Sequence, residues 1–272
     1  MAPMAATAKR RKPPKAQVPR PSRRRQDLPP HYWDLTHRPL QCLVFLLPMV
    51  LAYEVGMALT HGSLSPEVRP AALASQQLLY WFFSLFGATG GYLPGFALIL
   101  ILLVWHVAAH HAWRISSWGL LGMTGESVVL ALPILLLNDF LPGRVLEGLT
   151  RHGTRSSVEE LLLCIGAGIY EELVFRLIII SLLTLLLIDI LRVRQVTGVA
   201  LAVIISSLLF SAHHYAPIGD DAWSTSSFAF RAAAGAYLAA VFVVRGFGLA
   251  VGCHAFYDII AFTLDQDLGT GV

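Results

Sequence analysis

Seven long apolar runs dominate this chain and limit what it can fold into. A helix needs about 20 mostly apolar residues to cross a bilayer, and it satisfies its own backbone hydrogen bonds, as a lipid environment requires. The composition agrees, because 14% of the residues are charged, whereas soluble domains carry about 25%. We therefore predict an all-α, polytopic membrane helix bundle of about seven or eight transmembrane helices. The runs comprise residues 40–59, 93–113, 127–141, 158–191, 196–212, 228–244 and 247–264.

Two segments leave the number and shape of the spans open. The run 71–86 is short and contains Gln76 and Gln77, so it is an eighth span, a re-entrant segment or an interfacial helix. The run 158–191 is too long for a simple span, since a helix rises about 1.5 Å per residue. We expect it to tilt, to project from the membrane or to break near Gly166 and Gly168.

The N-terminal segment is basic and rich in proline. Ten of the twenty Lys and Arg precede Leu40, and the first acidic residue is Asp27. Such a segment cannot bury enough apolar surface to fold, and we predict a disordered basic tail over residues 1–38. We expect it to contact anionic lipid, where each cation contributes about 1 kcal/mol. No aromatic residues interleave the charges as base stacking would require, so no nucleic acid partner is expected.

The same charges predict the orientation of the protein. By the positive-inside rule the N-terminus is cytoplasmic, and we expect a multi-pass protein of the plasma (inner) membrane of a bacterium. With seven spans, Arg114, Arg192, Arg194 and Arg245 fall on the cytoplasmic side, and Arg144, Arg151 and Arg155 fall outside. An eighth span would change these assignments for much of the chain.

Three charged residues interrupt the longest apolar run. Each of Glu171, Glu172 and Arg176 costs roughly 2.5–3.5 kcal/mol at the bilayer centre, so the cluster costs about 8 kcal/mol before any pairing. Glu172 and Arg176 are four residues apart and face each other on a helix. Glu171 points elsewhere and is a candidate general base. The alternative is an ion-pair cluster that only determines helix packing.

Two histidines share this apolar setting. His214 lies one helical turn after Phe210, and His254 lies one turn before Asp258, which is placed to orient the imidazole. Together with Glu171 these groups could activate a water molecule and stabilise an oxyanion, with or without a metal. The two histidines are expected at different depths in the membrane, because His214 lies at the end of one apolar run whereas His254 lies about 10 Å inside another. The two side chains can meet only if a helix continues past His213 or if the turn 246–248 lies inside the membrane.

The order and spacing of these residues resemble a known signature. Glu171-Glu172-x-x-x-Arg176, Phe210-x-x-x-His214 and His254-x-x-x-Asp258 are similar to the three motifs of the CPBP family of intramembrane proteases, which includes the CAAX-processing endopeptidase of the Ras-converting type and the bacterial lysostaphin-resistance proteins. The resemblance divides the chain into the tail 1–38, N-terminal transmembrane helices 39–157 and a protease core 158–264. It implies a membrane-embedded peptidase that hydrolyses a membrane-associated protein or peptide, with CAAX processing as the precedent.

The resemblance also implies roles for the residues. Glu171 activates water with support from His214, Glu172 and Arg176 are structural and electrostatic partners, and His254 with the residue four later binds the oxyanion or completes the water site. That last residue is often Asn in the family. Here it is Asp258, which accepts but cannot donate when ionised, so orienting His254 or ligating a metal is favoured. Family members are often described as metalloproteases, and two His with one carboxylate suit a divalent metal such as zinc. A metal-free glutamate–histidine mechanism is the alternative.

Other functions and sites fit the sequence less well. One alternative is a catalytically silent scaffold of the same fold, but the residues of all three motifs are intact, which favours an enzyme. Another is a transporter or channel, but the polar groups are confined to three helices and do not trace a path through the membrane. Neither His-Glu-x-x-His nor Gly-x-Ser-x-Gly occurs. Gly219 and Asp220 lie in a polar turn that we interpret as a solvated loop. His106, His110 and His111 could share a metal, but the flanking tryptophans favour an interfacial belt.

Overall fold

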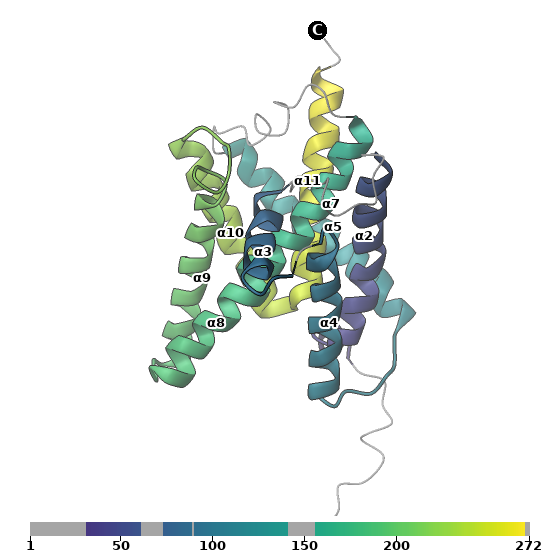
Figure 1. Cartoon of the computed structure of the whole chain (residues 1–272), viewed down its shortest axis with the longest axis vertical. Coiled ribbons are helices and arrows are strands. Elements are labelled where there is room, and N and C mark those ends of the chain that lie inside the picture. The colour runs from purple at the N-terminus through teal and green to yellow at the C-terminus, as the bar shows by residue number, and fades with distance from the viewer. Residues whose placement is uncertain (1–30, 61–72, 89, 141–155, 270–272) are drawn as a thin grey trace, which may run out of the picture. The chain divides into compact units, whose positions relative to one another are not determined.

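The computed structural model describes residues 31–60, 73–88, 90–140 and 156–269, and residues 32–272 belong to one compact unit. Within the described residues the regular structure is helical, with no strand, which confirms the all-α prediction (Figure 1). Each of the seven apolar runs forms a helix. The helices are α1 (Tyr32–Thr36), α2 (Pro39–Thr60), α3 (Ala74–Ser84), α4 (Leu93–Ala108), α5 (Ser117–Phe140), α7 (Ser157–Glu172), η3 (Leu173–Ile180), α8 (Ser181–Thr184), η4 (Leu185–Ile190), α9 (Gln195–Ala212), α10 (Thr225–Arg245) and α11 (Phe247–Gly269).

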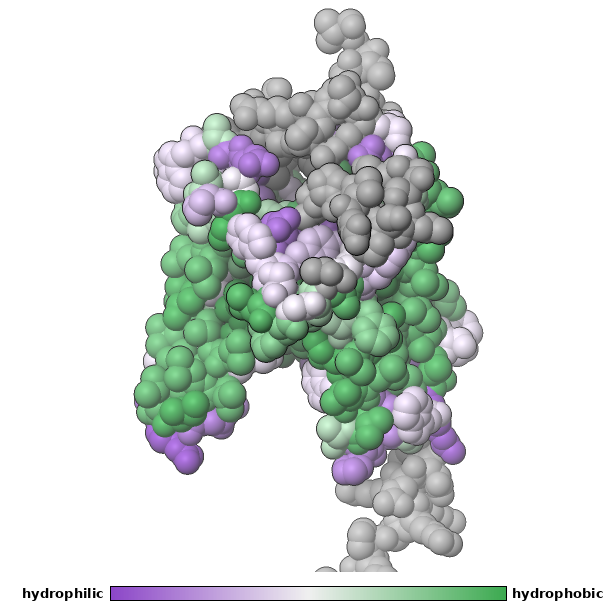
Figure 2. Space-filling model, in the orientation of Figure 1, coloured by the Kyte–Doolittle hydropathy of each residue, from purple (hydrophilic) through white to green (hydrophobic). Residues whose placement is uncertain are grey.

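Six helical segments in the described part of the chain are long and apolar enough to cross a membrane, and α4 is a shorter apolar helix. Their outward faces carry large apolar side chains, which form the green belt around α4, α8 and α9 in Figure 2. The helix α3 has 11 residues, too few to cross a bilayer, since a span needs about 20. The side chain of Gln76 is buried and accepts a hydrogen bond of 2.9 Å from Tyr53 of α2, so this polar residue is satisfied inside the protein.

The longest run does not break at its glycines. It is helical without interruption from Ser157 to Ile190, and it changes from α to π geometry at Leu173, directly after the glutamate pair. In Figure 1 the segment α8 leans away from the direction of α7. The glycines serve packing instead. A Cβ on Gly168 would lie 2.8 Å from the Cβ of Ala255, so the glycine allows α11 to approach α7 closely. Single π turns are often found at functional sites.

The turn between α10 and α11 is buried beneath α1. Gly246 adopts φ 94°, a conformation that favours glycine, and a Cβ there would lie 2.8 Å from the carbonyl oxygen of Thr36. The neighbouring Arg245 makes a two-pronged ion pair with Glu126 of α5, at 2.5 and 2.7 Å, and its guanidinium carbon lies 3.6 Å from the ring centroid of Trp33. The first helix thus covers the turn and the ion pair beside it.

This arrangement bears on two expectations from the sequence. Helix α1 lies within residues 1–38, the segment predicted to be a disordered tail, yet Leu35 and Thr36 are buried; residues 1–30 lie outside the described residues.

The buried turn between α10 and α11 also explains how His214 and His254 come to the same depth. Helix α9 ends at Ala212 and does not continue past His213, so the first of the two expected possibilities does not occur. In Figure 1 the lower ends of α4 and η4 extend below the start of α11. His254 therefore reaches the level of His214.

Candidate active site

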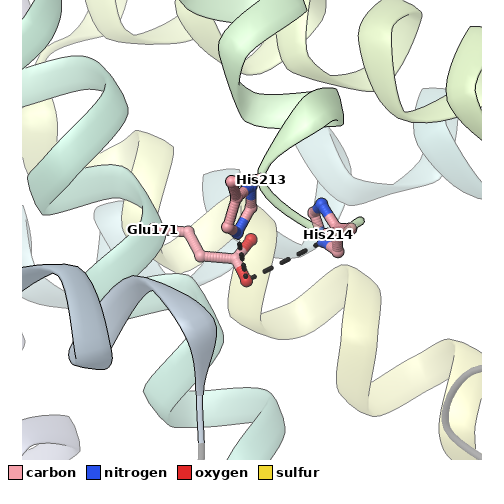
Figure 3. Close-up of side chains that lie close together, drawn as sticks. All are labelled: Glu171, His213 and His214. Atoms are coloured by element: carbon pink, nitrogen blue, oxygen red, sulfur yellow. Dashed lines mark ion pairs between the residues drawn. The ribbon is translucent and has the colours of Figure 1, made fainter. Parts of the chain in front are cut away.

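Polar residues of α7 and α11 and of the segment directly after α9 meet around Glu171. Figure 3 shows Glu171 with His213 and His214. One carboxylate oxygen, Oε1, lies 3.6 Å from Nε2 of His213 and 4.0 Å from Nε2 of His214. The other, Oε2, lies 3.8 Å from Nε2 of His254. The structure thus gathers Glu171, His214 and His254, which are far apart in the sequence, at one buried position.

Glu172 joins the other half of the cluster. Its Oε1 accepts a hydrogen bond of 2.7 Å from Nδ1 of His254, and its Oε2 lies 3.0 Å from Nε of Arg176, with both side chains of that ion pair fully buried. Arg176 also donates to the carbonyl oxygen of Gly235 at 3.2 Å and stacks over the ring of Phe210. The predicted pairing of Glu172 with Arg176 is present, and the same carboxylate orients His254.

Asp258 lies beside His254, as its spacing of four residues predicts. Its Oδ2 lies 3.5 Å from Nε2 of His254, the ring nitrogen that also faces Glu171. The closer contact of His254 is the one between Nδ1 and Glu172. Two carboxylates therefore contact the ring of His254 from opposite sides, Asp258 at Nε2 and Glu172 at Nδ1.

His213 belongs to the cluster although sequence reasoning did not include it. Its Nδ1 lies 2.5 Å from the carbonyl oxygen of Phe210, and Nδ1 of His214 lies 3.0 Å from the same oxygen. A carbonyl oxygen only accepts, so each Nδ1 carries a proton and each Nε2 is presented to Glu171. On a continuing helix adjacent residues point about 100° apart, which predicts one histidine facing the site. The helix ends at Ala212 instead, and both rings turn inward.

The donor set fits a divalent cation. The candidate ligand atoms of Glu171, His213 and His214 all lie within 4.8 Å of one another. Burial and the neighbouring His213 lower the pKa of His214 below its ordinary value, so its ring is neutral at pH 7, as metal binding requires. Two nitrogen lone pairs facing a carboxylate oxygen repel one another unless a proton or a cation lies between them. Two imidazoles and a carboxylate are a known ligand set of catalytic zinc.

The cluster lines a cavity of about 410 Å³. Its walls include the start of α3, one side of α7 from Glu160 to Glu171, the loop after α9 and parts of α10 and α11. The charged lining residues are Glu160, Glu171, Asp220, Asp221, Arg231 and Asp258. Arg231 pairs with Asp221 at 2.5 Å. Gly219 sits so close to the carbonyl of His214 that a Cβ would collide with it. The turn at Gly219 and Asp220, interpreted above as a solvated loop, is thus part of the cavity wall, and Asp220 is exposed.

Comparison with known proteins points to the same segment. Residues 155–260 match the family model described as type II CAAX prenyl endopeptidase Rce1-like, and the matched segment contains all three motifs. No significant match was found among curated proteins or among solved structures. The match confirms the resemblance to the CPBP proteases and implies a membrane peptidase of the CAAX type. Residues 155–260 are therefore similar to the Rce1-like domain of the type II CAAX prenyl endopeptidases, and the described part of the chain has six helices that are long and apolar enough to cross a membrane.

Proposed function

We propose that the protein is an intramembrane endopeptidase in which Glu171 and His214 activate the water that hydrolyses a peptide bond. The observation that carries this proposal is the position of the Glu171 carboxylate, within 4.0 Å of three imidazole nitrogens in the wall of one cavity. A general base must reach the proton that it abstracts directly or through one water. A water between Glu171 and His214 meets that condition.

The proposed hydrolysis uses these groups in the following order. The water gives a proton to Glu171 while its oxygen bonds to the scissile carbonyl carbon, and the electron pair of the carbonyl moves to its oxygen. His254 is held through Nδ1 by Glu172. In its doubly protonated form, stabilised by the neighbouring carboxylates, its Nε2 faces the same space and can donate to this oxyanion. The intermediate then expels the amine, which takes the proton from Glu171, and the acid and amine products leave.

The role of a metal is a second part of the proposal. Glu171, His213 and His214 would hold a divalent cation such as zinc, which when bound polarises water and carbonyl groups. Without a cation, the same carboxylate and imidazoles bind and orient the water through hydrogen bonds. In both cases Glu172 and Arg176 position His254 and do not themselves touch the reacting atoms.

The substrate that we propose is a protein or peptide associated with the lipid bilayer, with CAAX-type processing as the family precedent. We propose in addition that the N-terminus is cytoplasmic and that the protein resides in the inner membrane of a bacterium. The orientation rests on the ten Lys and Arg that precede Leu40.

The purified full-length protein in proteoliposomes, presented with a peptide library that includes prenylated and unprenylated members, tests the activity. We expect cleavage by the unaltered protein and a loss of at least about 10²-fold in Glu171→Gln and His214→Ala, because positioned acid–base groups contribute roughly 10²–10⁴-fold. Asp189→Asn, an exposed change in η4, is the matched control and should cleave normally. Cleavage that survives both site changes would refute the mechanism, and no cleavage of any peptide would favour a scaffold.

A further inference from the structure

The end of α4 carries a buried histidine that the candidate active site does not use. His106 lies in the last turn of the helix and is 1% exposed. Neither of its ring nitrogens has a hydrogen-bond partner among the described residues. The flanking Trp105 and Trp113 are exposed, as an interfacial belt predicts, but His106 is not. Buried polar side chains almost always have a partner in the protein, an ordered water or an ion, so this imidazole points to a ligand.

The chain folds back after this histidine. His110 adopts φ 52°, a conformation that few residues other than glycine adopt, and its backbone nitrogen donates to the carbonyl oxygen of Val107 at 3.1 Å. The reversal brings two rings of the following segment to His106. The ring centroid of His111 lies 6.2 Å from that of His106, and the ring of Trp113 meets His106 edge-on, with 4.5 Å between the centroids.

The returning segment is fastened to α2. The side chain of Gln41 is buried. It donates to the carbonyl oxygen of Ser116 at 2.9 Å and accepts from the backbone nitrogen of the same residue at 3.0 Å. This two-way bond restricts the segment 109–116, so the approach of His111 to His106 is a property of the fold.

We propose that His106 and His111 bind a divalent transition-metal ion such as zinc. Imidazole nitrogens are favoured ligands of zinc, nickel and copper. At a zinc–nitrogen distance of about 2.0–2.1 Å, two imidazoles on one ion have ring centroids about 5–6.5 Å apart, a range that includes the observed 6.2 Å. The partial negative charge at the C-terminal end of a helix also favours a cation there. His111 is exposed, so water can complete the coordination.

The role of this ion is structural. It joins the last turn of α4 to the segment that leads into α5, and it gives the buried imidazole of His106 a partner. The site shares no residue with Glu171, His213 and His214, the candidate metal ligands of the active site. The proposal therefore adds a second site and does not depend on the proposed hydrolysis.

Zinc binding to the purified full-length protein, prepared with an affinity tag that contains no histidine, tests the proposal. Zinc per chain is measured after equilibrium dialysis in the unaltered protein, in His111→Ala and in His213→Ala, which removes a candidate ligand of the active site. We expect H111A to bind one zinc ion fewer than the unaltered protein, and to do so also in the H213A background. His110→Ala changes an exposed neighbour and is the matched control, which should keep the ion.

Thermal unfolding gives a second readout, because a ligand that binds only the folded state stabilises it. In the H213A background, zinc should raise the melting temperature, and adding His111→Ala should abolish the rise. The exposed position of His111 leaves the core intact in this variant.

His106→Gln tests the buried ligand and keeps a polar side chain at that position. Groups that only orient a metal ligand influence affinity by about 10–100-fold, so loss of the ligand itself should weaken zinc binding by at least about 10-fold. Zinc binding in H111A equal to that of the unaltered protein, or an equal loss in H110A and H111A, would overturn the proposal. Peptidase activity is not a readout here, so either proposal can fail while the other stands.

Discussion

Nδ1 of His254 donates a 2.7 Å hydrogen bond to Glu172, the carboxylate that also pairs with Arg176 at 3.0 Å. The bond connects α11 to α7 and determines which nitrogen of His254 faces Glu171. Groups that orient a catalytic histidine typically influence activity by 10–100-fold in comparable metal sites. The second glutamate of the pair is thus a positioning residue, and it contributes to stability as well.

Glu172→Gln tests this role. The amide keeps the size of the side chain but leaves the buried Arg176 without a counter-charge, and removing one partner of a buried pair costs about 3–5 kcal/mol. We expect the melting temperature to fall and kcat to fall by roughly 10–100-fold with a smaller change in KM. Asp189→Asn, an exposed change in η4, should change neither. A variant with lowered stability and unchanged kcat would show that Glu172 is structural alone.

Metal binding separates His213 from His254. The candidate ligands are Glu171, His213 and His214, whereas Nδ1 of His254 is occupied by Glu172. We expect His213→Ala and His214→Ala to lose bound metal, and His254→Ala to retain it while cleaving slowly. Metal content and the visible absorption of a cobalt-substituted sample measure this. Metal lost in H254A but kept in H213A would contradict the assignment, and activity at full strength in metal-free protein would establish the metal-free mechanism.

The close approach of α7 and α11 is testable at Gly168. In Gly168→Ala the new Cβ would lie 2.8 Å from the Cβ and 2.9 Å from the backbone nitrogen of Ala255, and overpacking of this kind costs about 1–3 kcal/mol. We expect reduced activity, because the helices that carry Glu171 and His254 are pushed apart. Adding Ala255→Gly should restore part of the loss.

Gly125→Ala provides the control for this substitution, since a Cβ at Gly125 has nothing within 4 Å. It should leave activity intact and stabilise the helix by up to about 1 kcal/mol. Equal effects of the two alanines would refute the steric explanation.

The cover that α1 forms over the α10–α11 turn predicts a coupling between distant residues. Glu126→Ala leaves Arg245 buried without its partner, and we expect a loss of about 2–3 kcal/mol, less than for a fully buried pair because Glu126 keeps 23% of its side chain exposed. In a double-mutant cycle with Arg245→Ala the two losses should not add. Thermal unfolding of the four proteins measures this, and additive losses would contradict the pairing. Asp34→Asn, exposed on α1, is the control.

Run length and local spacing were enough to predict the class of fold and part of the site. A lipid environment admits few backbone structures, so long apolar runs determine a helical membrane bundle. A spacing of four residues on a helix determines that Glu172 and Arg176 meet. Both inferences use interactions within one helix or between one helix and its solvent. The motif resemblance added residues on other helices and was confirmed over residues 155–260.

Contacts between helices were decided by the tertiary structure. His213 joins the site because α9 ends at Ala212 and two rings share the carbonyl of Phe210, and Glu172 orients His254 because α7 and α11 pack in one particular register. The short α3, the π geometry after Glu172 and the buried turn under α1 are likewise outcomes of packing. Apolar periodicity determines which segments are helices, but many relative placements of those helices bury similar apolar area. The particular side chains that meet across an interface select one of them.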